Sequence, residues 1–155
     1  MHIHDDGGAG RERGLAGRIA LIIGNGSVDT TVVRGSSSVV GSWAHVAGTY
    51  DAATGTAKLY VNGVLDGTAT GTPGLIGNKP SPLGIGSSIS YNVNAYHLNG
   101  SLDELRLYDS ALSASEIANH VAGQFNATGL KALWHFDETQ GHFTTNTNKY
   151  NNKLT

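Results

Sequence analysis

Residues 42–67 read SWAHVAGTYDAATGTAKLYVNGVLDG and predict two β-strands followed by the start of a third. In residues 43–50 successive side chains alternate between two faces, as they do in a half-buried strand. The cluster DAATGT at 51–56 predicts a turn in which Gly55 can adopt a positive φ at little cost. Asn62-Gly63 is the strongest short-range hairpin signal, because both central residues of a type I′ turn need positive φ. The stretch therefore predicts an antiparallel meander, which specifies no chemistry by itself.

The composition favours one all-β domain and excludes several kinds of function. The chain has 155 residues with 22 glycines, about twice the usual share, and its 14% charged residues compare with about 25% on average. A net charge of −2 with scattered Lys and Arg argues against nucleic acid as a partner. Because cysteine is absent, disulfides and thiolate zinc sites are excluded. No apolar run approaches the roughly 20 residues of a membrane helix, and no secretory signal is visible in residues 1–14.

Outside the meander the pattern predicts mainly further strands. These expected strands lie at residues 15–23, 30–34, 82–86, 101–108 and 130–136, and a turn at Asn99-Gly100 precedes the fourth of them. One helix is expected over residues 114–122, because Ser113 and Glu116 form a capping box and Gly123 is placed to end the helix. Ile117 and Val121 lie one turn apart and should pin the helix to the sheet.

We expect three regions along the chain. Residues 1–14 are Gly-rich and polar and predict a flexible arm, residues 15–127 form the core, and residues 128–155 hold a strand and an Asn-rich tail. Trp43 and Trp134 are expected in the core, and His45 in the alternating strand is expected to be structural. The residue patterns predict an all-β fold class with one short helix.

Several ordered motifs resemble the second half of a known module. They are WAHVAGTYD at 43–51, LYVNG at 59–63, PLGIG at 82–86, NGSLDELRLY at 99–108 and ALSASEI at 111–117. At this spacing the sequence, over about residues 15–122, is similar to the laminin-G-like, concanavalin A-like jelly rolls. The resemblance implies two packed antiparallel sheets, as in modules that bind glycans or mediate adhesion. Related folds include true glycosidases.

One motif departs from that family pattern by its position. The family begins with a strand similar to GLKALWHFDE at 129–138, which here lies near the C-terminus, and the strands that follow it are not visible. Two explanations stay open: the chain is cut from a tandem array, or the module is permuted and the strand at 130–136 completes its own sheet or a neighbour's. Open strand edges favour pairing with another chain, so a homo-oligomer or filament built by strand exchange is a hypothesis.

The resemblance also implies a structural Ca²⁺ site. In related jelly rolls the acidic residue at the position of Asp103 contributes to calcium binding near the first strand, whose motif here contains Asp137 and Glu138. Ca²⁺ takes about six to eight oxygen ligands, which two or three carboxylates and backbone carbonyls can supply. The alternative is that Asp103 and Glu104 pair with Arg106 or face solvent.

A loop rich in aromatic and amide side chains is the candidate glycan platform. Its proposed contact residues are Tyr91, Asn92, Asn94, Tyr96 and His97. Aromatic faces stack on sugar C–H groups and amides bond hydroxyls, although such a loop can equally pack over the edge of the sandwich. Glycoside hydrolysis needs two carboxylates across a cleft, and no ExDxxE-type cluster is present.

The sequence thus favours a non-catalytic carbohydrate-binding or adhesion module of an extracellular or cell-surface protein. A self-assembling structural subunit is the alternative, and an accessory fragment of a glycoside hydrolase or lyase is the third hypothesis. The place where residues 130–136 pair distinguishes a strand that completes its own sheet from one that is given to a second chain.

Overall fold

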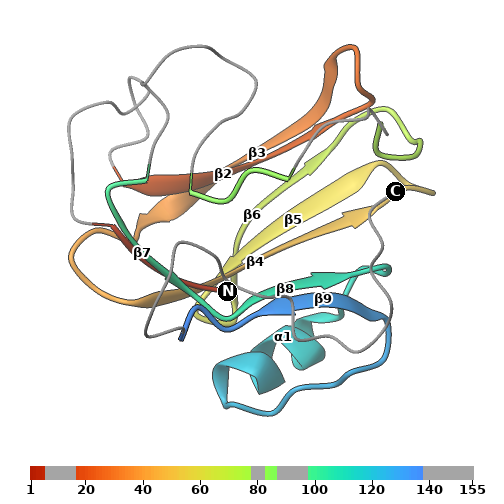
Figure 1. Ribbon diagram of the computed structural model, residues 1–155. Coiled ribbons are helices and arrows are strands. Elements are labelled where there is room, and N and C mark those ends of the chain that lie inside the picture. The colour runs from red at the N-terminus through yellow and green to blue at the C-terminus, as the bar shows by residue number, and fades with distance from the viewer. Residues whose placement is uncertain (6–16, 78–82, 87–97, 138–155) are drawn as a thin grey trace.

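The computed structural model describes residues 1–5, 17–77, 83–86 and 98–137 (Figure 1). These residues form nine strands and one helix. In chain order they are β1 (His2–Asp5), β2 (Arg18–Gly24), β3 (Asp29–Ser38), β4 (Ala44–Asp51), β5 (Thr56–Val61), β6 (Val64–Thr70), β7 (Gly100–Asp103), β8 (Leu105–Tyr108), α1 (Ala114–Val121) and β9 (Leu130–Trp134). The prediction of an all-β chain with one short helix is confirmed.

The strands form one five-stranded sheet and two hairpin-sized sheets. The large sheet has the order β6-β5-β4-β1-β7, and β2 pairs with β3 while β8 pairs with β9. The β2–β3 pair packs over the face of the large sheet, as Figure 1 shows, which makes the sandwich. Apolar side chains of both layers fill the core between them. The buried core residues are Ile3, Ile23, Val33, Val39, Ala44, Val46, Ala57, Leu59 and Val61.

The meander at residues 42–67 forms as predicted. β4 pairs antiparallel with β5 from Val46↔Val61 to Asp51↔Thr56, and β5 pairs antiparallel with β6. Asn62 and Gly63 have φ of 50° and 80°, the positive pair that a type I′ turn requires. Leu59, 1% exposed, lies at the centre of this meander and in the core of the sandwich.

The first residues of the chain differ from the expected arm. His2–Asp5 form β1, which lies between β4 and β7 and pairs antiparallel with both. Ile3 is 7% exposed and belongs to the core. A segment with a single apolar residue has little local preference for a strand. It becomes a strand here because it pairs with β4 and β7, which are distant in the sequence.

The strand expected after the turn at Asn99-Gly100, up to Tyr108, is divided in two at Glu104. This residue has φ of 54°, in the left-handed region that side chains rarely adopt, so regular pairing cannot run through it. Before it, β7 pairs with β1, and after it β8 pairs with β9. One continuous stretch of chain therefore serves two sheets.

The strand near the C-terminus pairs within its own chain. β9 aligns antiparallel with β8 in the register Leu105↔Trp134, Arg106↔Leu133 and Leu107↔Ala132. β9 therefore completes a two-stranded sheet with β8 of its own chain.

Two local expectations are wrong. The expected strand at 82–86 does not form in its described part, because Gly86 has φ of 74° and Leu83 is 54% exposed rather than buried. Trp43, expected in the core, is 53% exposed. It precedes β4, and the adjacent Ala44, 3% exposed, takes the core position in its place.

The helix begins as the sequence predicts but turns a different face inward. The Ser113 hydroxyl accepts from the Glu116 N–H, and the Glu116 carboxylate accepts from the Ser113 N–H, which completes the capping box. Ile117 is fully buried as expected, but Val121 is 43% exposed and His120 is 6% exposed. The helix therefore packs through positions three apart, 117 and 120. No helix in the described part of the chain is long and apolar enough to cross a membrane.

Candidate functional site

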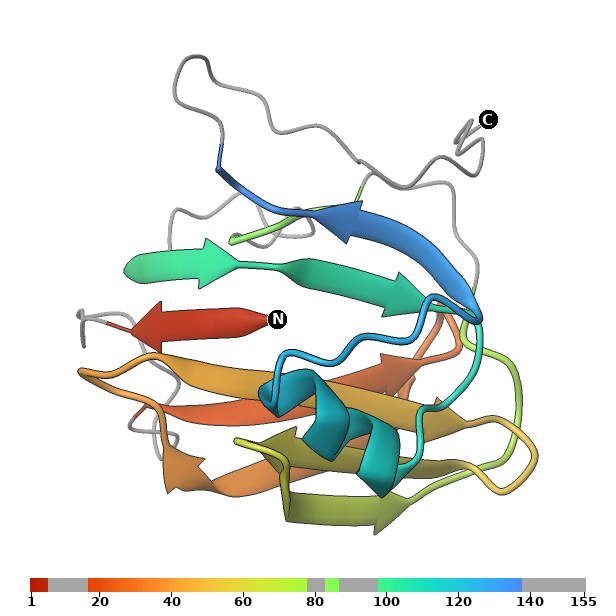
Figure 2. The same ribbon diagram turned by 90° about the horizontal axis from the view of Figure 1, so that it is seen from below.

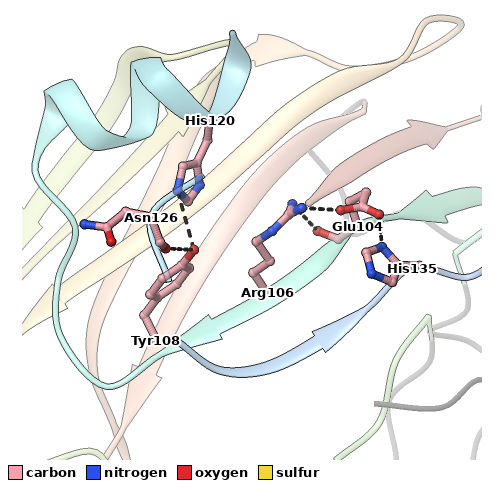
Figure 3. A network of polar contacts seen from close by, with 6 residues as sticks. All are labelled: Glu104, Arg106, Tyr108, His120, Asn126 and His135. Atoms are coloured by element: carbon pink, nitrogen blue, oxygen red, sulfur yellow. Dashed lines mark hydrogen bonds and ion pairs between the residues drawn. The ribbon is translucent and has the colours of Figure 1, made fainter. Parts of the chain in front are cut away.

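A groove of about 510 Å³ lies where the β8–β9 pair meets the loop after α1. We call it the Phe125 groove. It is lined by Glu104, Arg106, Tyr108, Phe125, Asn126, Ala127, Leu130, Leu133 and His135. β8 supplies Arg106 and Tyr108 to the lining, and the loop after α1 supplies Phe125 and Asn126. Figure 3 shows six residues of this region.

Glu104 is the centre of a charged cluster at one end of the groove. Its carboxylate accepts from the Arg106 guanidinium and bonds the His135 ring, and Arg106 Nη1 also donates to the Glu104 carbonyl at 3.3 Å (Figure 3). Burial by itself would raise the pKa of Glu104, but the hydrogen bond from His135 and the charge of Arg106 lower it overall. Glu104, whose backbone is left-handed, thus joins Arg106 and His135 in one charged cluster.

Phe125 forms the aromatic wall of the groove. The Arg106 guanidinium carbon lies 3.7 Å from the centre of the Phe125 ring, a cation–π contact. The His120 ring meets Phe125 edge-on at 5.3 Å between centroids. Phe125 is nevertheless 49% exposed, so two neighbours orient the ring while part of it faces solvent.

Tyr108 links the groove to the helix. Its hydroxyl donates to the Asn126 carbonyl at 3.0 Å and meets His120 Nε2 at 3.5 Å (Figure 3). Burial raises the pKa of Tyr108, and burial lowers the pKa of His120. The Asn126 side chain accepts from the Thr128 N–H at 2.9 Å and so folds the loop back on itself. These bonds fix the loop that carries Phe125.

A second cavity, of about 520 Å³, lies between β4 and β8, and we call it the β4–β8 cleft. The β2 side chains Ile19, Leu21 and Ile23 lie on one side of it, and Ile117 and His120 of α1 line it as well. His45, which is 4% exposed, stands at one end, and its Nδ1 has no hydrogen-bond partner among the described residues. Burial lowers the pKa of His45 to about 4.

His45 also belongs to a row of three imidazoles. Its ring lies 5.3 Å from that of His2 and 6.4 Å from that of His120, both nearly edge-on. The described residues nevertheless contain no group of three or more His, Asp or Glu side chains placed to hold a metal ion. The three rings contact one another edge to face, and His45 is the most buried of them.

The expected glycan platform, Tyr91, Asn92, Asn94, Tyr96 and His97, lies outside the described residues. So does Glu138 of the expected calcium site. Asp103 ends β7, opposite His2, and Asp137 follows β9. Because Leu105 is aligned with Trp134, both carboxylates lie toward the same end of the β8–β9 pair. Glu104 does pair with Arg106, the alternative that the sequence had left open.

Sequence patterns do not single out Phe125, Asn126 and His135 as binding residues. The available signal is weak: Phe125-Asn126 is an aromatic–amide pair directly after a helix, and His135 follows the Trp of β9. The groove exists because the loop folds back over β8, a long-range arrangement that spacing does not reveal.

Comparison with known proteins identifies the fold family. The family model described as the concanavalin A-like lectin/glucanases superfamily, a laminin-G-type family, matches residues 2–118. A candidate carbohydrate-binding protein from Bacteroides ovatus ATCC 8483 is similar in structure, with a TM-score of 0.63 and 20% identity over 94% of this chain and 47% of that chain. An S-layer domain-containing protein (residues 221–444) from Clostridium thermocellum ATCC 27405 has a TM-score of 0.42 and 23% identity, over 72% of this chain and 65% of that one.

This chain spans about half the length of the first of these structures and 65% of the second. No curated protein matches the sequence significantly. At 20% identity the likeness to the Bacteroides protein shows a shared fold. The family model covers most of the chain and agrees with the motifs and with the observed sandwich. The chain belongs to the concanavalin A-like lectin/glucanase superfamily.

Proposed function

We propose that this chain is a non-catalytic carbohydrate-binding module and that the Phe125 groove forms part of its binding surface. The observation that carries the proposal is an exposed aromatic ring fixed beside an ordered cluster of charged side chains. Aromatic rings contact the apolar faces of sugars, and planar charged groups bond sugar hydroxyls. Family membership and the fold shared with the Bacteroides protein support the same function.

Preorganisation makes the groove suitable for a weakly held ligand. Arg106 is 7% exposed at its side chain and is fixed between Glu104 and Phe125. Such side chains lose little rotamer freedom when a sugar binds, which lowers the entropic cost of binding. Arginine has five N–H donors in a fixed plane, and a carboxylate has about four acceptor positions, so both can also bond a hydroxyl.

The single acidic side chain among the described lining residues supports binding rather than hydrolysis. Glycosidases use two carboxylates that flank the scissile bond. Glu104 is the only acidic side chain among the described residues that line the groove, and its carboxylate already bonds Arg106 and His135. The hydrogen bond from His135 lowers its pKa although burial opposes this, which disfavours a role as general acid.

We further propose an extracellular or cell-surface location, with adhesion as one use of glycan binding, because carbohydrate ligands of such modules lie outside the cell.

We also propose that Asp103, Asp137 and Glu138 contribute to a Ca²⁺ site. Two of these carboxylates lie toward one end of the β8–β9 pair, and carboxylate oxygen is the ligand type that Ca²⁺ prefers. Calorimetric titration with CaCl₂ after EDTA treatment tests it, and an absence of binding at millimolar Ca²⁺ would contradict it.

A glycan array probed with and without Ca²⁺ tests the main proposal. We expect binding to a limited set of glycans, and no binding in either condition would refute it. Calorimetry with the best ligand should then show at least tenfold weaker binding for Phe125→Ala, about 1.4 kcal/mol. Leu75→Ala is the control, since Leu75 is 84% exposed and lines neither cavity.

The same calorimetric titration, repeated with further variants, identifies which surface binds the glycan. If Phe125→Ala binds normally while Tyr91→Ala or Tyr96→Ala loses binding, glycan recognition belongs to the loop at 91–97, and the groove is not the site. Unchanged binding in all three variants would exclude both surfaces. A time course with the bound polysaccharide, followed by a reducing-sugar assay, should show no release of new reducing ends.

A further inference from the structure

We propose that His135 is the specificity-determining residue of the Phe125 groove: its Nε2 accepts a hydrogen bond from one hydroxyl of a bound hexopyranose. Glu104 is the positioning residue, because it holds the imidazole in the tautomer that leaves Nε2 without a proton. This role rests on the proposed function of the groove as a carbohydrate site. A hexopyranose suits the lining because it has apolar C–H faces, which aromatic rings contact, and hydroxyl donors at its rim.

The contact between Glu104 and His135 decides which nitrogen of the imidazole carries the proton. His135 Nδ1 bonds Glu104 Oε1 across the β8–β9 pair (Figure 3). Burial would raise the pKa of Glu104, but the hydrogen bond from His135 and the charge of Arg106 keep it below its ordinary value, so the group is ionised at neutral pH. An ionised carboxylate only accepts hydrogen bonds, so Nδ1 must be the donor. In the neutral ring, Nε2 is then an acceptor.

The second nitrogen of the imidazole is available to a ligand. His135 lines the groove, and its side chain is 36% exposed. In Figure 3, Nδ1 faces Glu104 and the other ring nitrogen lies on the far side of the ring. Of the two nitrogens, Nδ1 is the one that bonds a described residue. Nε2 is therefore an acceptor that a hydroxyl in the groove can approach.

Glu104 is itself held in place by Arg106. Its second carboxylate oxygen accepts from the guanidinium, and Arg106 Nη1 also donates to the Glu104 carbonyl at 3.3 Å. The guanidinium carbon in turn lies 3.7 Å from the centre of the Phe125 ring. A glycan in the groove therefore meets an aromatic ring and an acceptor, His135, that one chain of contacts connects. Such preorganisation lowers the entropic cost of recognising one arrangement of hydroxyls.

The backbone around this cluster supports a binding role. Figure 2 shows β9, in blue, beside β8, and the last aligned pair at one end of the two strands is Leu105↔Trp134. Directly beyond that pair, Glu104 has φ of 54° and Phe136 has φ of 59°, in the left-handed region that ordinary side chains rarely adopt. Both strands thus leave regular pairing where Glu104 bonds His135. Backbone strain of this kind collects at ligand sites, because the surrounding structure must hold it in place.

Nuclear magnetic resonance titration of the full chain with simple sugars tests the acceptor. The probes are methyl β-D-glucopyranoside, methyl β-D-galactopyranoside and methyl α-D-mannopyranoside at pH 8, well above the ordinary pKa of an imidazole. We expect at least one of them to bind in the millimolar range. Its deoxy and deoxyfluoro analogues at one hydroxyl position should both bind about five- to tenfold more weakly, because neither can donate a hydrogen bond there. Binding of none of the three sugars, or equal binding of all analogues, would refute the proposal.

Two variants assign the lost hydrogen bond to His135. His135→Leu should bind the parent sugar about five- to tenfold more weakly than the wild-type chain and should no longer distinguish it from the deoxy analogue. His135→Gln can place an amide oxygen near the position of Nε2 and should bind within about threefold of the wild-type chain. Leu75→Ala, at a position 84% exposed and outside the groove, is the control. If His135→Leu still distinguishes the two sugars, another group accepts the bond and the role of His135 is wrong.

The ¹⁵N signals of the imidazole test the role of Glu104 without replacing His135. In the wild-type chain His135 should show a protonated Nδ1 and an unprotonated Nε2, and the Nε2 signal should shift when the sugar binds. Glu104→Gln removes the ionised acceptor and should raise the share of the tautomer with a proton on Nε2. A proton on Nε2 in the wild-type chain, or an unchanged tautomer in Glu104→Gln, would refute the positioning role.

The array and the variants together separate the role of His135 from the proposed function. Glycan binding that Phe125→Ala weakens and His135→Leu leaves unchanged would overturn the role of His135 and retain the groove as the binding site. An absence of glycan binding on the array would refute the proposed function, and the role of His135 with it.

Discussion

Replacing His45 by phenylalanine should remove much of an acid-induced loss of stability. His45 is 4% exposed, its Nδ1 bonds no described residue, and the rings of His2 and His120 stand beside it. Burial lowers its pKa from 6.5 to about 4, so the folded protein holds this imidazole neutral. Unfolding releases the imidazole to water, where it binds a proton at its ordinary pKa. Acid therefore favours the unfolded state.

The magnitude follows from proton linkage. With a folded pKa of about 4 and an unfolded pKa of 6.5, this group contributes fully above pH 6.5, and the contribution is lost as the pH falls toward 4. Between pH 7 and pH 4.5 the loss in the free energy of unfolding is about 2.4 kcal/mol. Phenylalanine cannot titrate, and the ring adjoins the β4–β8 cleft, so there is space for the larger side chain.

Urea denaturation at pH 7 and pH 4.5, followed by tryptophan fluorescence, measures the effect. The wild-type chain should lose about 2 kcal/mol more between the two pH values than His45→Phe does. His2 and His120, whose pKa values burial also lowers, leave a residual slope of the same sign in the variant. An equal loss in both proteins, within about 0.5 kcal/mol, would show that His45 titrates normally and is not buried as described.

Two further substitutions test contacts outside the cavities. Asp66 of β6 accepts hydrogen bonds from Ser36 and Ser37 of β3 at 2.6–3.3 Å, so Asp66→Ala should lower the free energy of unfolding by about 2 kcal/mol. Burial would raise the pKa of Asp66, but the hydrogen bonds from Ser37 and Ser36 lower it overall. The stability difference between wild type and Asp66→Ala should therefore shrink as the pH falls below about 3.8. A difference that does not depend on pH would contradict this. Ser113→Ala removes the cap of α1 and should cost about 1 kcal/mol in thermal or urea unfolding. Asn119→Ala, at an exposed position of the same helix, is its control, and equal effects of the two would argue against the capping box.

Features decided by residues within a few positions of one another could be predicted from the sequence. The turn at Asn62-Gly63 requires positive φ at both residues, and both have it. The capping box needs only Ser113 and Glu116, and it forms as expected. The motifs that resemble laminin-G-like modules also predicted the all-β fold, because their spacing reflects strand lengths and turns that the sandwich requires.

Features decided by distant partners could not be predicted in the same way. Ile3 is buried because β4 and β7 flank it, and residues 1–14 contain no pattern that predicts this pairing. Glu104 fits an alternating strand by pattern, yet its left-handed backbone breaks the strand so that β8 can pair with β9. Trp43 is large and apolar, but the small Ala44 fits the tight position in the core.

The candidate site follows the same division. The platform expected at 91–97 was selected for its composition, and it lies outside the described residues. The Phe125 groove combines a loop with two strands, and its charged cluster joins Glu104 to His135 across 31 positions of sequence. Composition identifies residue types that can bind sugars, whereas a fixed groove depends on which of them the fold brings together.

The Phe125 groove is built from a part of the chain that is separate from the central meander. The described residues that line it all come from one continuous segment, 104–135, that includes β8, α1 and β9. The meander that builds the sandwich contributes no side chain to it. Under the proposed function, substitutions in segment 104–135 would change ligand preference and leave the pairing of β4, β5 and β6 as it is. The same segment would then be a natural unit to transplant between related sandwiches, together with its proposed specificity.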